Sequence, residues 1–328
     1  MTPAHAMPIE SSTVRELERC APGAVTYNVL LSRITRWRIG GYASALVEPR
    51  NSSEASSVMA ALSRLTVPVV VIGETTNILF DSRGFDGIVI RIGPAMAEVA
   101  INGTCIHAQA GASVPALAHA AGRAGLSGIE HTVGIPGTLG GLVLMNGGSQ
   151  RRGIGDNVLQ VTCADLNGGV RQLDAVECGF SYRKSSLQAA KVIVTDVILE
   201  LSRGDPAVIA DTMNNILAER ASKFPSDYPN CGSTFLSNPE MYSTIGPPGR
   251  AIEEAGLKGY RIGGAQVSTK HANFLLNLGH ATSDDILRLI AHIRDTVFTR
   301  TGYLMDCEVR HIAPDGVVRP AHEKASEL

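Results

Sequence analysis

The sequence lacks a strong net charge, and this absence excludes whole classes of partner. Its 29 lysines and arginines nearly balance its 31 aspartates and glutamates, so the formal net charge is −2 at pH 7. No overall electrostatic field therefore draws the chain to nucleic acid or to an anionic membrane surface. We expect a small-molecule partner, no nucleic acid and no insertion into a membrane.

The chain also lacks a cysteine motif, a secretion signal and a long apolar run. None of its six cysteines belongs to a C-x-x-C pair or to a local Cys/His cluster. This spacing argues against a disulfide framework and against a zinc site, and it favours a reducing compartment. No basic segment followed by an apolar core opens the chain, and no apolar stretch approaches the length of a membrane span. These absences predict a cytoplasmic protein without a bound metal.

Glycine, by contrast, is concentrated in one run, which reads GIEHTVGIPGTLGGLVLMNGGSQRRGIG from Gly128 to Gly155. So many glycines beside a short apolar stretch indicate backbone packed closely against another group, because glycine has no side chain in the way. The run matches neither the dinucleotide fingerprint G-x-G-x-x-G nor the phosphate loop G-x-x-x-x-G-K-[ST]. Taken alone, it is compatible with a ligand cradle or with a cluster of turns between buried strands.

The 328 residues, 44% of them hydrophobic, can bury a substantial core and form two or three domains. Residue patterning predicts strands at 43–48, 67–72, 87–92, 97–110, 158–165, 169–173, 192–201 and 274–277. It predicts helices at 53–65, 114–122, 206–222, 250–255 and 284–300, after one helical turn at 14–20. Asn167 and Gly168 are typical of a hairpin turn, Ser52 or Ser53 of one helix cap, and Thr282 with Asp285 of another.

Four separated segments together resemble the UDP-N-acetylenolpyruvoylglucosamine reductase family, flavoenzymes that make UDP-N-acetylmuramate for bacterial peptidoglycan. They are TRWRIGG (35–41), GIPGTLGG with MNGG (134–141 and 145–148), FSYRKSS (180–186), and YPNCGSTF followed by EEAGLKGYRIGGAQVSTKHANF (228–235 and 253–274). The resemblance spans about residues 30–312 in the same order, which carries far more weight than any single motif. The extra tyrosine-bearing loop of the first type has no clear counterpart, so the chain resembles the shorter second type.

The resemblance implies an α+β fold, with a two-lobed FAD-binding domain of the PCMH/vanillyl-alcohol-oxidase type and a C-terminal α/β substrate-binding domain. The expected boundaries are an N-terminal extension at 1–28, an FAD-binding domain at 29–204, a substrate-binding domain at 205–315 and a tail at 316–328. The two lobes of the FAD-binding domain are expected at about 29–93 and 94–204. Non-covalent FAD, NADPH as reductant, and a monomer or weak dimer complete this expectation.

The family reaction implies three catalytic residues. Reduced flavin gives a hydride to C3 of the enolpyruvyl group of UDP-N-acetylglucosamine enolpyruvate, and negative charge then develops at C2 and in the attached carboxylate. Arg183 in YRKS matches the arginine that neutralises this carboxylate, since a guanidinium fork meets both oxygens. Ser233 in NCGSTF matches the donor that protonates C2, and Glu308 in CEVR matches the third, acidic member. Taken alone, each would be interpreted as a surface charge or a turn residue.

The resemblance also assigns the FAD contacts, mostly to backbone turns. They are Arg38, Gly40, Gly41, Gly73, Thr75, Thr76, Asn77, Gly134, Ile135, Pro136, Gly137, Thr138, Gly140 and Gly141, and Trp37 is expected to pack. The turn at 73–77 reads GETTN where the family usually has GGGSN. The carboxylate of Glu74 would be repelled by a pyrophosphate unless it points away.

Lys223, Tyr228, Asn230 and Gln266 are candidates for gripping the UDP-sugar, whereas Lys270 and His271 are equally compatible with a structural role. The segment MNGGSQRRG carries Arg151 and Arg152 where the family often has Ala-Tyr-Gly-Gly, and Asn238 is displaced by one residue. These departures leave open a paralogous flavin reductase that acts on a related nucleotide sugar. A flavin-binding protein without turnover, or a plain oxidase of the same fold, is disfavoured because all three catalytic residues are retained.

Overall fold

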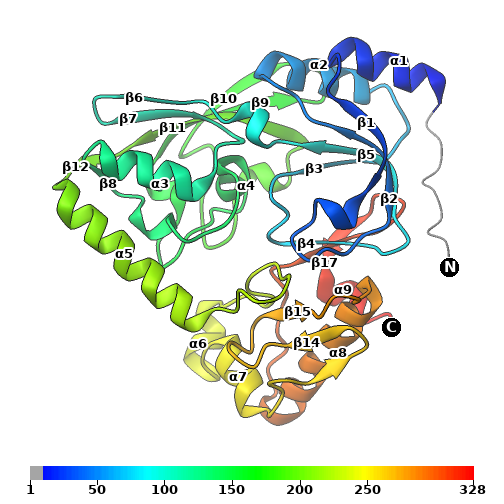
Figure 1. The fold of residues 1–328 in the computed structure, drawn as a ribbon, viewed down its shortest axis with the longest axis vertical. Coiled ribbons are helices and arrows are strands. Elements are labelled where there is room, and N and C mark those ends of the chain that lie inside the picture. Colours follow the sequence, from blue (N-terminus) through cyan, green and yellow to red (C-terminus); the bar gives the residue numbers. More distant parts are fainter. Residues whose placement is uncertain (1–9) are drawn as a thin grey trace.

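The computed structural model describes residues 10–328, which form two mixed lobes followed by a C-terminal unit (Figure 1). Residues 1–9 of the expected N-terminal extension lie outside the described residues. The rest of that extension begins with α1 (Ser11–Cys20), which is longer than the single turn predicted at 14–20. Strand β1 (Val25–Leu30) follows it and was not predicted.

The first lobe contains a four-stranded sheet in the order β1-β2-β5-β3. Strands β2 (Tyr42–Val47), β3 (Val69–Ile72) and β5 (Phe85–Arg91) confirm the strands predicted at 43–48, 67–72 and 87–92. They run parallel to one another, and β1 pairs antiparallel with β2. Helix α2 (Ser52–Leu62) begins one residue earlier than predicted. Its cap is Asn51, whose side chain accepts the N–H of Glu54, so the assignment of the cap to Ser52 or Ser53 was wrong.

The second lobe is built on a five-stranded antiparallel sheet in the order β10-β9-β11-β7-β6. The predicted hairpin at Asn167 and Gly168 is confirmed: Gly168 has a φ of +76° and joins β9 to β10. The strands are β6 (Val99–Asn102), β7 (Cys105–Gln109), β9 (Val158–Asp165), β10 (Val170–Asp174) and β11 (Val192–Glu200). Helices α3 (Val114–Arg123) and α4 (Leu139–Leu144) belong to the same lobe, as do the short paired strands β8 (Leu126–Ser127) and β12 (Ser202–Arg203).

The two lobes share one hydrophobic core. Val58 and Leu62 of α2 are buried in it together with Val161 of β9 and Val197 of β11. Helix α2 therefore packs between the two sheets, and the lobes hold each other in a fixed relation.

Helix α5 (Pro206–Lys223) links the second lobe to the C-terminal unit and crosses the lower left of Figure 1. Asp205 caps it, and the predicted apolar stripe of Ile209, Met213 and Ile216 is buried against Val133. Within residues 10–328, none of the helices combines the length with the low polarity that crossing a bilayer requires.

The C-terminal unit packs helices on a small sheet in the order β13-β14-β15. The capping box predicted at Thr282 and Asp285 is confirmed at the start of its longest helix, α8 (Ser283–Thr301). The remaining elements are α6 (Pro239–Thr244), α7 (Pro248–Glu254), β13 (Arg261–Ile262), β14 (Ala265–Val267) and β15 (Leu275–Asn277). Residues 316–328, expected as a tail, instead contain β17 (Val318–Pro320) and α9 (Ala321–Ala325), which packs on α8.

Strand pairing joins the C-terminal unit to the first lobe. Strand β4 (Ile78–Phe80) directly follows the GETTN turn and pairs in parallel with β16 (Arg310–Ile312), which in turn pairs with β17. Trp37 is also part of this junction: its indole N–H donates to the carbonyl of Leu275 at 2.8 Å, and Asn277 donates to the carbonyl of Trp37 at 2.8 Å. Trp37 is 1% exposed within the C-terminal core, which fits the packing role expected for it.

Candidate active site

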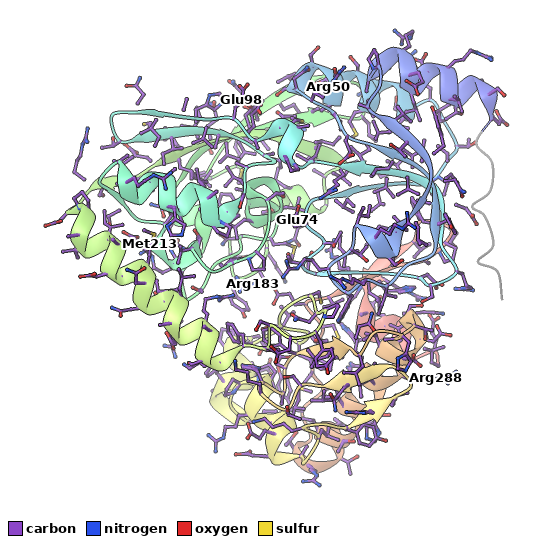
Figure 2. All side chains as sticks on the ribbon, in the orientation of Figure 1. Arg50, Glu74, Glu98, Arg183, Met213 and Arg288 are labelled. Carbon is purple, nitrogen blue, oxygen red and sulfur yellow. The ribbon has the colours of Figure 1, made fainter. Side chains whose placement is uncertain are left out.

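Arg183 occupies a strained turn at the centre of the molecule, where the second lobe meets the C-terminal unit (Figure 2). Ser181 and Lys184 exchange two backbone hydrogen bonds around it, and its φ is +55°. A non-glycine residue in this region of φ is uncommon and costs conformational energy. The turn aims the guanidinium so that Nη2 donates to the carbonyl of Gly148 at 3.0 Å. The predicted arginine is therefore held against the tail of the glycine-rich run.

Arg183 forms an ion pair with Glu308, as their two matched motifs suggest. Its Nε lies 3.1 Å from Oε1 of Glu308, and the two side chains are 22% and 20% exposed. Burial raises the pKa of the Glu308 carboxyl, and the charge of Arg183 opposes this rise. Among the described residues, Nε of Arg183 makes no well-aligned hydrogen bond, although it lies 3.1 Å from Oε1 of Glu308. The guanidinium thus keeps donors for a second carboxylate.

The segment that carries Ser233 lies beside Glu308. Phe235 pairs with Cys307 across an antiparallel bridge, and the N–H of Glu308 donates to the carbonyl of Thr234 at 2.9 Å. Ser233 itself pairs with Phe274 and is solvent-exposed. The three predicted catalytic residues therefore come from three distant segments and meet around one short stretch of backbone.

The two glycine-containing turns predicted to bind phosphate lie against each other. A Cβ added to Gly73 would come within 2.3 Å of Oγ1 of Thr138, so only glycine allows the approach. Among the described residues, the backbone N–H groups of Gly73, Thr76, Gly137 and Thr138 donate no hydrogen bond. Adjacent turns that carry unpaired N–H groups form an anion-binding concavity. The residues present therefore fit the pyrophosphate of a dinucleotide cofactor.

Glu74 does not oppose such an anion. Its carboxylate accepts from the guanidinium of Arg91 at 3.3 Å, and Arg91 also lies 3.5 Å from Glu48. The negative charge of Glu74 is thereby compensated on the side of the first lobe. The departure from GGGSN at this position is compatible with a bound pyrophosphate.

Thr75 is the strained residue of the same turn. It is 3% exposed and has a φ of +53°, a conformation that β-branched residues rarely adopt. Its hydroxyl accepts the backbone N–H of Arg36 at 2.9 Å, which ties the turn to the TRWRIGG segment. Arg38, two residues further on, also has a positive φ, of +55°. A side-chain hydrogen bond thus offsets part of the strain at a position where the family usually has glycine.

Other glycines of the predicted cradle are explained by packing against protein. A Cβ on Gly134 would lie 2.3 Å from Cδ of Arg220, and one on Gly140 would lie 2.9 Å from Cβ of Ala110. Gly40 and Gly41 are similarly enclosed by their own lobe. The N–H of Ile135 donates to Thr132, so it is not free for a ligand, contrary to the expected contact. Pro136 has no N–H to offer, and that of Gly141 is held by Oγ1 of Thr138.

Arg220 was missed by sequence reasoning. It lies on the last turn of α5, its guanidinium stacks on Phe224 at 4.7 Å, and burial lowers its pKa. Phe224 stacks on Phe274, the bridge partner of Ser233, at 5.0 Å between ring centroids. This stack connects the glycine-rich run to the Ser233 segment. Its only sequence signal is a basic residue at a helix end.

The candidates for the UDP-sugar are more dispersed. Lys223 pairs with Glu219, Tyr228 is 46% exposed, and the side chain of Asn230 shapes the turn before Gly232. Gln266 is 8% exposed and donates to the carbonyl of Gly259. Lys270, His271 and Asn238 have structural contacts: with the carbonyl of Ala221, with Phe224 and Phe274, and as the cap of α6. The first three candidates flank the Ser233 segment, whereas Gln266 belongs to the sheet.

Comparisons with known proteins give a consistent family. Residues 43–174 match the family described as FAD binding domain, and residues 224–312 match the C-terminal domain of UDP-N-acetylenolpyruvoylglucosamine reductase. The chain is 52% identical to UDP-N-acetylenolpyruvoylglucosamine reductase 1 of Corynebacterium glutamicum, over 91% of this chain and 89% of the relative. It is 38% identical to the corresponding reductase of a Synechococcus species, over 94% and 96% of the two chains.

A solved structure agrees with these sequence matches. The crystal structure of UDP-N-acetylenolpyruvylglucosamine reductase from Thermus caldophilus superposes with a TM-score of 0.75 at 31% identity, covering 88% of this chain and 98% of that one. The predicted fold class, an FAD-binding domain followed by a C-terminal α/β domain, is confirmed.

Replacing Thr75 with valine tests the strained turn. The Thr75→Val variant keeps the branched shape and loses the hydroxyl that holds the N–H of Arg36. A lost buried hydrogen bond of about 1 kcal/mol corresponds to a roughly fivefold weaker binding of FAD. Titrating FAD into the apoprotein and following flavin fluorescence measures this. Thr212→Val, on an exposed face of α5, is the matched control. Unchanged FAD affinity in Thr75→Val would rule out this role.

Replacing Glu308 with glutamine tests its raised pKa. The pKa of the Glu308 carboxyl is higher in the folded than in the unfolded protein. The folded state of the wild type therefore loses stability as the pH rises from the unfolded to the folded pKa, and the loss is constant above the folded pKa. The Glu308→Gln variant lacks this loss. Its free energy of unfolding relative to the wild type should therefore grow from about pH 4 upward and then level off. Urea denaturation at several pH values measures the difference, and a difference that is constant with pH would contradict the assignment.

Proposed function

The chain belongs to the UDP-N-acetylenolpyruvoylglucosamine reductase family, and from this premise we propose that Arg183, Ser233 and Glu308 act together on the substrate's enolpyruvyl group. The protein is an FAD-dependent oxidoreductase that reduces UDP-N-acetylglucosamine enolpyruvate to UDP-N-acetylmuramate in peptidoglycan synthesis, with NADPH as reductant. The observation that carries the proposal is the 3.1 Å pair of Arg183 and Glu308 beside the Ser233 segment. When bound, FAD supplies the hydride that adds to C3.

Arg183 binds the carboxylate of the enolpyruvyl group. Its guanidinium is permanently charged, and its fork of N–H donors matches the two oxygens of a carboxylate. The strained turn and the bond to Gly148 hold it in place before substrate arrives. Negative charge that spreads from C2 into the carboxylate is therefore met by a preorganised cation, and such preorganised charge is a large source of rate enhancement.

Ser233 donates the proton to C2. A serine hydroxyl is far too weak an acid to protonate an ordinary group, but it protonates a carbanion once one has formed. Its exposed position on the paired segment, beside the backbone of Glu308, supports this role.

Glu308 adjusts the charge of the site by gaining or losing a proton. With its pKa raised by burial, its carboxyl exchanges a proton more readily near neutral pH than an exposed glutamate does. Its pairing with Arg183 also keeps the guanidinium oriented while the site is empty of substrate. Glu308 is thus suited to share a proton with the reacting group as its charge changes.

The cofactor sits, in this proposal, along the two adjacent turns at 73–77 and 134–138. Their unpaired N–H groups receive the pyrophosphate, and Arg38 and Asn77 are exposed enough to reach other parts of FAD. Lys223, Tyr228 and Asn230 are proposed to face the diphosphate of the substrate from the side of Ser233. Gln266 acts through the turn at Gly259 that it holds.

We propose that the FAD-binding domain covers residues 29–204 and that the substrate-binding domain runs from residue 205 to the end of α9, because α9 packs on α8. A cytoplasmic location is proposed because UDP-sugars and NADPH are charged nucleotides that do not cross membranes unaided. A monomer or weak dimer remains the expected oligomeric state.

The overall reaction is tested by NADPH oxidation by the purified holoenzyme. Absorbance at the nicotinamide band should fall only when UDP-N-acetylglucosamine enolpyruvate is added, and UDP-N-acetylmuramate should accumulate in equal amount. Bound FAD with no substrate-dependent oxidation would favour the paralogue that acts on another nucleotide sugar.

The role of Ser233 is tested by separating the two half-reactions in anaerobic stopped-flow measurements. In Ser233→Ala, reduction by NADPH should stay within about twofold of wild type, and reoxidation by the enolpyruvyl substrate should slow by about 100-fold or more. Thr234→Val is the matched control, because this neighbouring hydroxyl is buried and has no hydrogen-bond partner in the described part of the chain. Normal reoxidation in Ser233→Ala would remove Ser233 from the acid role.

A further inference from the structure

The loop from Asn146 to Arg152, where the chain departs from its family, has a conformation that needs an explanation. Three of its non-glycine residues have positive φ: Asn146 at +40°, Gln150 at +54° and Arg151 at +62°. Such strain persists only where surrounding contacts impose it. The side chain of Asn146 bonds Ser181 and Gly155, and Ser149 donates to the carbonyl of His131. The loop is therefore anchored at its base, and its tip is held in an unfavourable conformation.

The tip presents Arg151 to the other half of the molecule. Cζ of Arg151 lies 5.9 Å from the centroid of the Tyr242 ring, within the range of a cation–π contact. Tyr242 is 50% exposed and belongs to α6 of the C-terminal unit. Among the described residues, Arg151 has no carboxylate partner, whereas its neighbour Arg152 lies 4.0 Å from Asp156 in its own lobe. Of these two neighbouring arginines, Arg151 is therefore the one that reaches the C-terminal unit.

A second contact spans the same gap. The hydroxyl of Tyr182 lies near the backbone of Ser237, which precedes α6, and near Tyr242; burial raises the pKa of this hydroxyl. Tyr182 directly precedes Arg183, whose guanidinium lies 5.4 Å from the Tyr182 ring centroid. The two contacts thus join the loop and turn beside Arg183 to the segment that follows Ser233.

Tyr242 has room to leave this contact. Its side chain also lines a cavity of about 520 Å³ between α6, α7 and α8, together with Ile245, Arg250 and Arg300. The Tyr242 ring is therefore not packed on all sides, and its contact with Arg151 lies at the surface.

We propose that Arg151 and Tyr242 form a clasp between the FAD-binding and substrate-binding domains, and that this clasp keeps Ser233 and Glu308 in place against Arg183 when substrate binds. This inference rests on the proposed function. Both residues are positioning residues, because they act through the relation of the two domains. An enzyme that is competent only when clasped binds substrate with an apparent affinity reduced by the fraction of open molecules. Loss of the clasp should therefore weaken apparent substrate binding and leave saturated turnover nearly unchanged.

Steady-state kinetics of paired variants test the clasp. Arg151→Gln and Tyr242→Leu should each raise the KM for UDP-N-acetylglucosamine enolpyruvate about fivefold, a typical factor for a contact of this kind, with kcat within twofold of wild type. Because both break the same contact, the double variant should also show about fivefold rather than the product of the two effects. Tyr242→Phe, which keeps the ring, and Arg152→Gln, the matched control, should keep the wild-type KM. Multiplicative effects, or an unchanged KM in Arg151→Gln, would overturn the clasp.

A readout without substrate separates this inference from the proposed function. In hydrogen–deuterium exchange of the unliganded holoenzyme, the peptide that covers residues 236–246 should exchange faster in Arg151→Gln and in Tyr242→Leu. It should stay at the wild-type rate in Tyr242→Phe and Arg152→Gln. This result supports the clasp even if the wild type does not turn over the expected substrate. Equal exchange in all five proteins would overturn it.

Discussion

The candidate active site depends on the backbone pairing of one short stretch, residues 306–312. At its first end, the N–H of Glu308 bonds the carbonyl of Thr234, and Leu236 bonds the carbonyl of Asp306. At its other end, β16 pairs with β4, and the N–H of Arg310 donates to the carbonyl of Asn77. The stretch therefore fixes the Ser233 segment on one side and the GETTN turn on the other. Glu308, at its middle, meets Arg183 from the second lobe.

Local strain accompanies this arrangement. Arg38, Thr75, Arg151 and Arg183 have positive φ, and each lies in a turn at the site or in the clasp at its edge. Two of these conformations are held by hydrogen bonds to other segments: the N–H of Arg36 donates to the hydroxyl of Thr75, and Arg183 donates to the carbonyl of Gly148. The free energy gained by burying the core that the two lobes share offsets the conformational energy of these positive-φ residues. A site of this kind is preorganised, because its charges and N–H donors need not be arranged when substrate binds.

Much of the fold could be predicted from the sequence, because its strands and long helices have strong periodicity. The buried runs of β3 and β5, the hairpin at Gly168 and the capping box of α8 all show local signals. The pairing of β4 with β16 could not be predicted, since three-residue strands carry no periodicity and their partners are more than 200 positions apart. The cap at Asn51 was missed because a serine followed it directly.

The candidate site was predictable only through the family motifs. Arg183, Ser233 and Glu308 lie on a turn, an irregular segment and a bend that precedes β16, where no pattern distinguishes them from surface residues. The glycine-rich run was informative, but for mixed reasons: open space surrounds Gly137, whereas Gly134 and Gly140 make room for Arg220 and Ala110. The contact of Arg151 with Tyr242 depends on how the two domains are placed relative to each other, and no local sequence pattern indicates that placement.

A crystal structure of the oxidised holoenzyme with UDP-N-acetylglucosamine enolpyruvate bound tests the proposed roles of Arg183, Ser233 and Glu308. The guanidinium of Arg183 should contact the enolpyruvyl carboxylate, and Oγ of Ser233 should lie about 3.5 Å or less from C2, with Glu308 beside them. An enolpyruvyl carboxylate bound away from Arg183, with C2 out of reach of Ser233, would rule out these roles.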